Sequence, residues 1–135
     1  MKRKGKKSRE VTSGSVQGDL PPHRHDADRA YSNSEYQRAI DLYTTTLSSG
    51  TPCAAVFNNR GLSYFALGDY ERAVDDFSRA IELEPGFINA WNNRGLTYQK
   101  MGEVEKAAQD FYTADDLDPD YSLEGTHVMP KLVTP

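Results

Sequence analysis

The chain has 135 residues, of which 37% are hydrophobic and 27% are charged, and its formal net charge is −4. This length and apolar fraction predict one folded domain. No run reaches the roughly 18 apolar residues of a membrane-spanning helix, and no apolar run follows the basic start as in a secretory signal, so we expect no membrane association. The single cysteine, Cys53, excludes an internal disulfide and Cys-rich metal sites. We expect a cytoplasmic protein, with the nucleus as the alternative.

The charges are unevenly distributed along the chain. Residues 1–9 carry six basic side chains and no acid, which leaves ten basic and twenty acidic groups in the rest of the chain. Residues 1–19 hold almost no large apolar group, so we predict a disordered basic tail there. Such a tail is typical of nuclear-import signals and nucleic-acid contacts, and equally of solubilising extensions. Nucleic acid would bind only through residues 1–9, because the acidic remainder repels it.

Residues 54–87 and 88–121 are two copies of one 34-residue unit. Without a gap, 14 of the 34 aligned positions are identical. A self-similarity of this length indicates a stacked repeat architecture. The identical pairs include Asn58/Asn92, Asn59/Asn93, Arg60/Arg94, Gly61/Gly95, Leu62/Leu96, Tyr64/Tyr98, Gly68/Gly102, Ala73/Ala107, Asp76/Asp110, Phe77/Phe111, Ala80/Ala114 and Pro85/Pro119.

Each unit reads as two helices. In the first copy, apolar and small residues follow helical spacing in two stretches, separated by Gly68 and ended by Pro85. Glycine favours a helix stop because it takes the left-handed conformation cheaply, and proline bars continuation of a helix. The two stretches contain Phe57, Gly61 and Tyr64, then Ala73, Phe77 and Ala80.

Residues 20–53 form a degenerate first repeat. Few of its residues equal those 34 positions later, but a second helix is predicted at about 35–47. Its first helix, within 24–33, has charged and small residues in place of the aromatic ones. The apolar face of that helix must come from Ala27, Ala30 and Tyr31.

Residues 122–135 form a C-terminal tail that does not begin a fourth unit, because Gly125, Pro130 and Pro135 interrupt it. The second helix of the last repeat therefore lacks an obvious cover, which a solenoid end requires. Three alternatives remain open: the tail folds back, the chain forms a homodimer through this helix, or a partner binds there. The apolar residues available in the tail are Leu123, Val128, Met129 and Leu132.

The 34-residue unit resembles the tetratricopeptide repeat (TPR). The matching residues are Phe57/Trp91, Gly61/Gly95, Tyr64/Tyr98, Ala73/Ala107, Phe77/Phe111, Ala80/Ala114 and Pro85/Pro119. The sequence departs from the family at Arg60 and Arg94, where leucine is usual. The resemblance implies a small stand-alone, all-α protein: a right-handed TPR solenoid of two clear helical hairpins, 54–87 and 88–121, plus the degenerate N-terminal hairpin 20–53. It further implies a concave groove that binds a peptide or a helix of a partner.

In TPR proteins the first helix of each hairpin lines this groove. If that carries over, the partner-binding residues are Asn58, Asn59, Leu62, Phe65, Asn89, Asn92, Asn93, Leu96, Gln99 and Lys100. Asparagine offers both donors and an acceptor, so it can pair with the backbone of an extended peptide. It is also a poor helix former, so two adjacent pairs inside helices favour a specific role over chance surface placement.

The carboxylate clamp of chaperone-binding TPR domains gives a co-chaperone alternative. That site holds the C-terminal carboxylate of a peptide with lysine, arginine and asparagine side chains from three repeats. Asn59 fits one of its places, but the first repeat offers Arg24 and Asp28 and the third offers Asn89 and Asn93. A carboxylate needs charge-assisted donors to offset its desolvation, so the sequence disfavours the clamp.

No residue set suggests catalysis, a metal site or a cofactor. Cys53 has no recognisable base beside it. The acidic pairs, such as Asp75-Asp76 and Asp115-Asp116, point in different directions on a helix, so they do not form a carboxylate pair. The sequence therefore predicts a non-enzymatic adaptor or scaffold for protein binding. The alternatives are a nucleic-acid-associated or nuclear factor that acts through the basic tail, and a co-chaperone.

Overall fold

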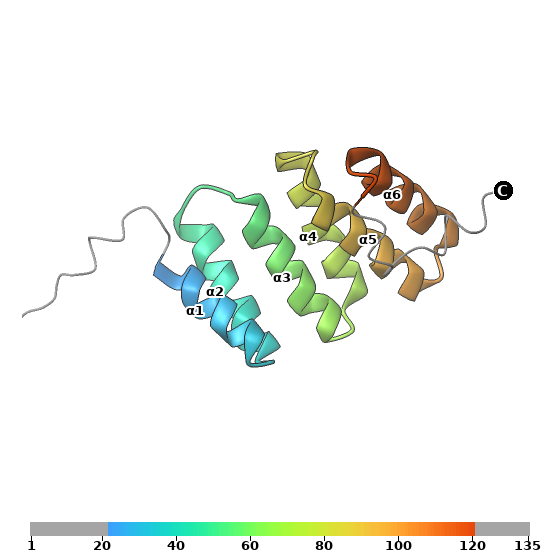
Figure 1. The fold of residues 1–135 in the computed structure, drawn as a ribbon. Helices are drawn as coiled ribbons and strands as arrows, with labels where there is room; N and C mark the ends of the chain where they lie inside the picture. The colour runs from blue at the N-terminus through green and yellow to red at the C-terminus, as the bar shows by residue number, and fades with distance from the viewer. Residues whose placement is uncertain (1–21, 121–135) are drawn as a thin grey trace, which may run out of the picture.

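The computed structural model describes residues 22–120, which form six α-helices and no strand. The helices are α1 (Pro22–Ser32), α2 (Tyr36–Ser49), α3 (Ala54–Ala66), α4 (Tyr70–Leu83), α5 (Ile88–Met101) and α6 (Val104–Leu117). Consecutive helices pair into three hairpins, which lie side by side with α1 and α6 at opposite ends of the row (Figure 1). No helix in the described part of the chain is both long and apolar enough to cross a membrane.

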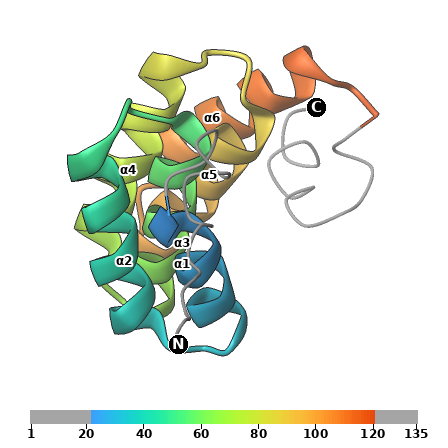
Figure 2. The same cartoon turned by 90° about the vertical axis from the view of Figure 1, so that its left-hand side faces the viewer.

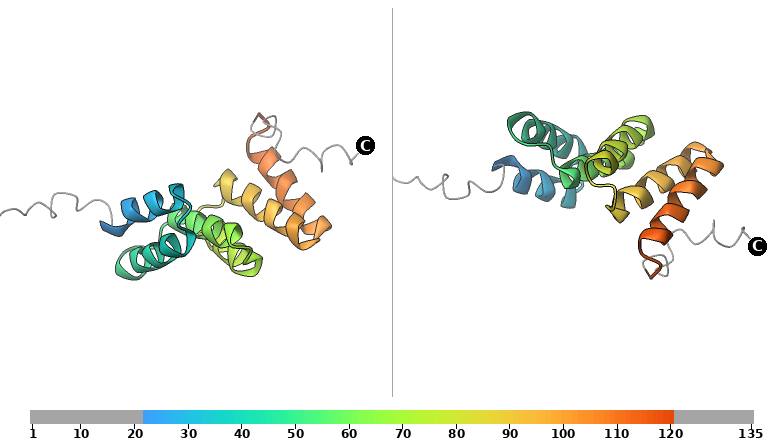
Figure 3. Two further views of the ribbon diagram at one scale, coloured as in Figure 1. Left: turned by 90° about the horizontal axis from the view of Figure 1, so that it is seen from below. Right: turned by 90° about the horizontal axis from the view of Figure 1, so that it is seen from above.

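The first helices of the three hairpins lie together. Helix α3 contacts both α1 and α5, whereas α2 and α4 lie along the other side of the row (Figure 2). Successive hairpins are turned relative to one another, so the row twists (Figure 3). The surface formed by α1, α3 and α5 is called the first-helix face below.

The turn inside each hairpin has the same geometry. Gly68 and Gly102 follow α3 and α5 with φ of 84° and 83°, in the left-handed region where glycine is unstrained. The next residue then donates its backbone N–H to the carbonyl five residues earlier, as from Asp69 to Tyr64 at 2.9 Å. The first hairpin makes the same bond from Glu35, but Ser34 occupies the left-handed position with φ of 65°.

The second and third hairpins are each closed by an aromatic ring packed against glycine. Phe77 of α4 packs on Gly61 of α3 so closely that a Cβ on the glycine would lie 2.7 Å from the ring. Gly95 and Phe111 repeat this arrangement at the same distance. Glycine is therefore required for the close approach of the two helices.

The hairpins are joined by a second set of contacts. Ala80 of α4 is fully buried in a cluster with Phe57 of α3 and Ala90 of α5. The indole Nε1 of the half-buried Trp91 donates to the carbonyl of Pro85 at 2.8 Å, which ties α5 to the turn before it. Burial of apolar surface between neighbouring hairpins is the expected source of stability in a solenoid.

The structure confirms the two predicted helices of the degenerate repeat. Helix α2 covers the predicted range, and in α1 the side chains Ala27 and Ala30 are buried while Tyr31 is half-buried. The predictions for the basic tail, residues 1–19, and for the C-terminal tail, residues 122–135, concern segments outside the described residues.

Candidate functional site

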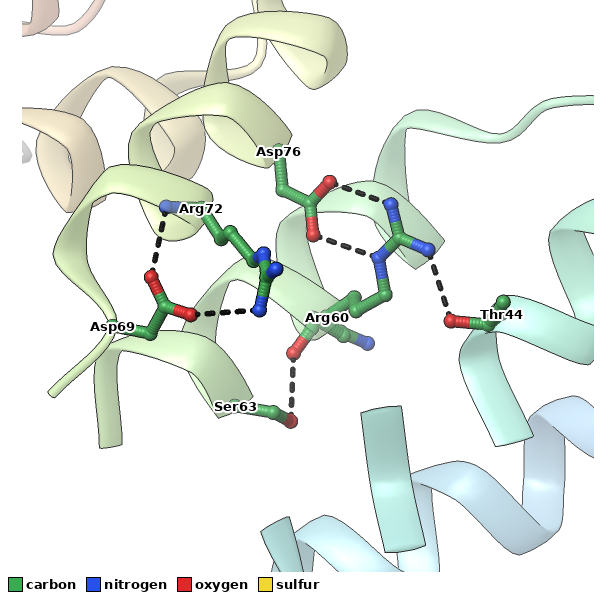
Figure 4. A network of polar contacts seen from close by, with 7 residues as sticks. Thr44, Arg60, Ser63, Asp69, Arg72 and Asp76 are labelled. Atoms are coloured by element: carbon green, nitrogen blue, oxygen red, sulfur yellow. Dashed lines mark hydrogen bonds and ion pairs between the residues drawn. The ribbon is translucent and has the colours of Figure 1, made fainter. Parts of the chain in front are cut away.

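Arg60 and Arg94, the two departures from the TPR pattern, each form a bidentate ion pair. Arg60 of α3 donates from Nε and Nη2 to the two carboxylate oxygens of Asp76 in α4, both at 2.8 Å (Figure 4). Its Nη1 donates to Thr44 of α2 in the preceding hairpin at 3.0 Å. Arg94 makes the same bonds to Asp110 at 2.8 Å and to Ser78 at 3.0 Å. Each arginine thus joins the helices of its own hairpin and bonds to the hairpin before it.

These pairs are largely withdrawn from water. The Asp76 side chain is 5% exposed and the Arg60 side chain 18% exposed. Burial raises the pKa of Asp76, and the hydrogen bonds and charge of Arg60 act in the opposite direction. The hydrogen bonds that Arg60 donates to Asp76 raise the pKa of Arg60. A pair this buried stabilises only with good geometry, which the two parallel bonds supply.

Aromatic rings flank the same guanidinium groups. The Cζ atom of Arg60 lies 5.7 Å from the ring centre of Phe57 and 5.8 Å from that of Tyr64. Arg94 lies 5.2 Å from the ring of Trp91 and 5.7 Å from that of Tyr98. Arginine at this position therefore keeps apolar contact while it makes polar bonds. These pairs are structural and do not belong to the first-helix face.

The asparagines form a hydrogen-bonded ladder across the hairpins. Asn93 of α5 donates from Nδ2 to Oδ1 of Asn58 in α3 at 3.0 Å. Asn58 donates to Asn59 at 3.3 Å, and Asn59 donates to Oδ1 of Asp28 in α1 at 3.3 Å. We call these four residues the amide ladder. Because each member holds the next, the exposed parts of Asn59 and Asn93 are fixed in orientation.

The ladder ends at a carboxylate in the first hairpin. Oδ1 of Asp28 also accepts a hydrogen bond from the hydroxyl of the buried Tyr43, and Oδ2 lies 3.8 Å from Nε of Arg24. Burial, together with the bond to Asp28, raises the pKa of Tyr43 well above its usual range. The guanidinium of Arg24, in the same helix, is thus engaged by Asp28.

The structure divides the predicted groove residues into two groups. Asn58 and Asn92 are only 4% and 3% exposed, which corrects the expectation that they line an open groove. The remaining residues are half-buried or exposed on α3 and α5; they are Asn59, Leu62, Phe65, Asn89, Asn93, Leu96, Gln99 and Lys100. Adjacent helix residues point about 100° apart, so only one asparagine of each pair can face outward.

Two features of the site were missed by the sequence reasoning. One is the pairing of Arg60 with Asp76, although arginine and aspartate recur together, 16 residues apart, in both clear repeats. The other is the role of Asp28 as the end of the amide ladder. Asp28 could not be recognised from the sequence, because the residues at the equivalent position of the second and third repeats are leucines.

Within residues 22–120 no group of three His, Cys, Asp or Glu side chains has a metal-binding arrangement. Cys53 is free and half-buried, and its Sγ lies 3.9 Å from Nη1 of Arg24. The described helices therefore offer one continuous candidate site, the first-helix face with its amide ladder.

Three helical hairpins stacked in one row define a helical-repeat solenoid. A family model described as TPR repeat matches residues 61–102, and one described as tetratricopeptide repeat matches residues 88–121. Solved TPR domains have the same fold, so the chain belongs to the TPR family and is an all-α TPR superhelix. A comparison with curated proteins finds no significant match.

Several similar structures are TPR domains with peptides bound. The second TPR domain of human RPAP3, in complex with the HSP70 peptide SGPTIEEVD, is 27% identical, with a TM-score of 0.71 over 76% of this chain and 86% of that one. The second TPR of Spaghetti (RPAP3), bound to the HSP90 peptide SRMEEVD, is 29% identical, with a TM-score of 0.69 over 72% and 84% of the two chains. The Sgt2 TPR domain from Aspergillus fumigatus is 27% identical, with a TM-score of 0.69 over 85% and 73%.

Proposed function

We propose that this protein is an adaptor that holds an extended segment of a partner protein on the first-helix face, with Asn93 and Asn59 as its polar contacts. The observation that carries the proposal is the amide ladder. Asn93 donates one of its two amide hydrogens to Asn58, and within the described chain its Oδ1 accepts no hydrogen bond. The amide can therefore accept a hydrogen bond from a peptide N–H and donate its second hydrogen to a peptide carbonyl. Because the ladder fixes this amide beforehand, binding loses little side-chain entropy.

The apolar side chains beside the ladder supply the rest of the contact. Leu62 and Leu96 follow Asn59 and Asn93 by three residues, one helical turn away, and both are half-buried. An extended peptide would place its backbone along the asparagines and an apolar side chain against the leucines. The peptide complexes of the two RPAP3 domains support peptide binding by this kind of fold.

Binding of an acidic chaperone C-terminus is the second candidate, and the bound peptides ending in EEVD favour it. The charges of the first-helix face disfavour it. Asp28 stands at one end of the ladder and engages Arg24, while Asn89 and Asn93 are neutral. The terminal carboxylate of a bound peptide would lose its water beside the carboxylate of Asp28 and would gain no charged donor in exchange. We therefore expect weak binding.

The test is selection of binders from a displayed library of random peptides, followed by titration against variants. We expect Asn59→Ala with Asn93→Ala to weaken the selected peptides by about tenfold or more, since each lost hydrogen bond costs about 1 kcal/mol. Asn33→Ala, in the exposed turn after α1, is the matched control and should bind normally. Unfolding curves of all variants separate a lost contact from lost folding.

Equal affinities of the double variant and the control would remove the first-helix face from the proposal. The peptides SGPTIEEVD and SRMEEVD are titrated in parallel. Tight binding of either, abolished by Arg24→Ala, would establish the co-chaperone alternative instead.

A further inference from the structure

The amide ladder runs in one direction because it ends at a carboxylate. An ionised carboxylate has no hydrogen to donate, so Asn59 turns its Nδ2 toward Asp28, at 3.3 Å. Oδ1 of Asn59 then accepts from Asn58 at 3.3 Å, and Oδ1 of Asn58 accepts from Asn93 at 3.0 Å. Every donor of the ladder therefore points toward α1, and the amide oxygen of Asn93 is left at the far end. Asp28 thus fixes the orientation of the amide on α5 that we propose binds the partner.

Asp28 itself has an oxygen that the described chain leaves open. Its Oδ1 accepts two hydrogen bonds, from the hydroxyl of Tyr43 and from Asn59. Its Oδ2 accepts none from the described residues, since Nε of Arg24 lies 3.8 Å away, beyond hydrogen-bond distance. Nη1 of that arginine lies 3.9 Å from Sγ of Cys53, so its guanidinium is divided between two weak contacts. Because the side chain of Asp28 is 43% exposed, the carboxylate can accept a hydrogen bond from a bound molecule.

The charge of the described chain favours a basic partner. Residues 22–120 contain nine basic and seventeen acidic side chains, a balance of −8. Such an excess attracts cationic groups and repels anionic ones before any contact is made. On the first-helix face itself, the exposed Lys100 is on α5, whereas Asp28 is on α1. A basic side chain of a bound segment is therefore expected over α1 rather than over α5.

We propose that the bound segment carries an arginine or lysine side chain that donates a hydrogen bond to Oδ2 of Asp28, while the backbone of the segment binds Asn93. This inference rests on the proposed function, because it assigns the chemistry of a segment held on the same first-helix face. A charged donor here meets a charged acceptor, which gives a stronger bond than the neutral amides offer. A carboxylate that only anchored the ladder would give no preference among the side chains of the partner.

The experiment compares the peptides that the full chain and two variants select from one displayed library of random peptides. The unmodified chain should select peptides with arginine or lysine at one fixed position. Asp28→Asn keeps the size of the side chain and an oxygen for the hydroxyl of Tyr43 but loses the charge, so its peptides should show no such preference. Asp26→Asn is the matched control, because it removes the same charge from an exposed position of the same helix. The preference should remain in that variant.

A second measurement replaces the basic residue of a selected peptide with glutamine. We expect about fivefold weaker binding to the unmodified chain and to Asp26→Asn, but a loss of less than about twofold on Asp28→Asn. Carbodiimide coupling of the corresponding lysine peptide to the unmodified chain, which needs no variant, should join the lysine to Asp28, as located by mass spectrometry.

Three outcomes would each overturn this inference while the adaptor proposal stands: selected peptides without a basic preference, an equal loss on Asp28→Asn, or coupling only to other carboxylates. Failure to select any peptide would overturn both.

Discussion

The first hairpin and the two that follow reach one geometry through different chemistry. The second and third hairpins use glycine against phenylalanine, glycine in the turn and a buried arginine–aspartate pair. The first uses Ala27 beside Tyr43, has Ser34 in the turn, and has Asp26 and Leu42 where the ion pair would stand. The hydroxyl of Tyr43 bonds instead to Asp28, which receives the amide ladder. The three hairpins therefore share one backbone geometry, although the hydrogen bonds and ion pairs that stabilise it lie at different positions in the first hairpin.

The largest effect is expected from breaking the ion pair that the first hairpin lacks. Asp76→Ala leaves the guanidinium of Arg60 buried without its partner, so we expect a loss of about 3 kcal/mol in the free energy of unfolding, measured with urea. Glu82→Ala, which breaks the exposed pair with Arg79, should cost less than about 0.5 kcal/mol. Equal losses of stability in the two variants would mean that the buried ion pair contributes no more than an exposed one. The pair would then not be an energetic difference between the first hairpin and the others.

The double substitution Arg60→Leu with Asp76→Leu tests the comparison from the other side. It removes both charges and gives α3 the leucine that is usual in the family. Since replacement of a complete buried pair by apolar residues is often close to neutral, the double variant should be more stable than Asp76→Ala alone. A double variant as unstable as the single one would show that the bond to Thr44, rather than the pair, carries the effect.

The next largest effect is expected at the glycine that the first hairpin replaces with alanine. Gly95→Ala would bring a Cβ to 2.7 Å from the ring of Phe111, which must then shift; we expect a loss of about 2 kcal/mol. Gly86→Ala is the control, because no heavy atom lies within 4 Å of the added carbon. Thermal or urea unfolding measures both, and an unchanged Gly95→Ala variant would mean that the ring moves at no cost.

At alkaline pH the stability of the protein is expected to depend on Tyr43 of the first hairpin. The pKa of Tyr43 is raised by burial and by Asp28, so above pH 10, the ordinary tyrosine pKa, the unfolded chain loses this proton before the folded one does. Stability therefore falls with rising pH, by up to about 1.4 kcal/mol per pH unit from this group. Tyr43→Phe should remove that part of the slope, whereas Tyr36→Phe in the same hairpin should keep it. Identical slopes in the two variants would contradict the assignment.

The smallest effect is expected in the turn of the first hairpin. Ser34 has φ of 65°, where residues with a side chain are strained, so Ser34→Gly should stabilise the protein by about 1 kcal/mol. Gly68→Ser, the reverse change at φ of 84° in the second hairpin, should destabilise it by a similar amount. Thermal midpoints measure both, and shifts of the same sign would refute the equivalence of the two turns.

Most of the fold could be predicted from the sequence, because the residues that pack the helices together recur in both clear repeats. Gly61, Phe77 and Gly68 each recur 34 residues later, and their spacing alone indicates the helices and the turns. The site was predicted less well, because spacing does not say which of two adjacent asparagines faces outward. Asn58 lies inside the stack since the neighbouring hairpin covers it, and that depends on the twist between hairpins rather than on the order of residues.

The bond from Trp91 to the carbonyl of Pro85 has a spectroscopic consequence. Trp91 is the only tryptophan of the chain, and it stands at the joint between the second and third hairpins, beside the guanidinium of Arg94. Its fluorescence therefore reports on this joint, while circular dichroism reports on all six helices. If the two signals change at one urea concentration, the hairpins unfold as a unit. If the fluorescence changes first, the array comes apart at the joint before its helices melt.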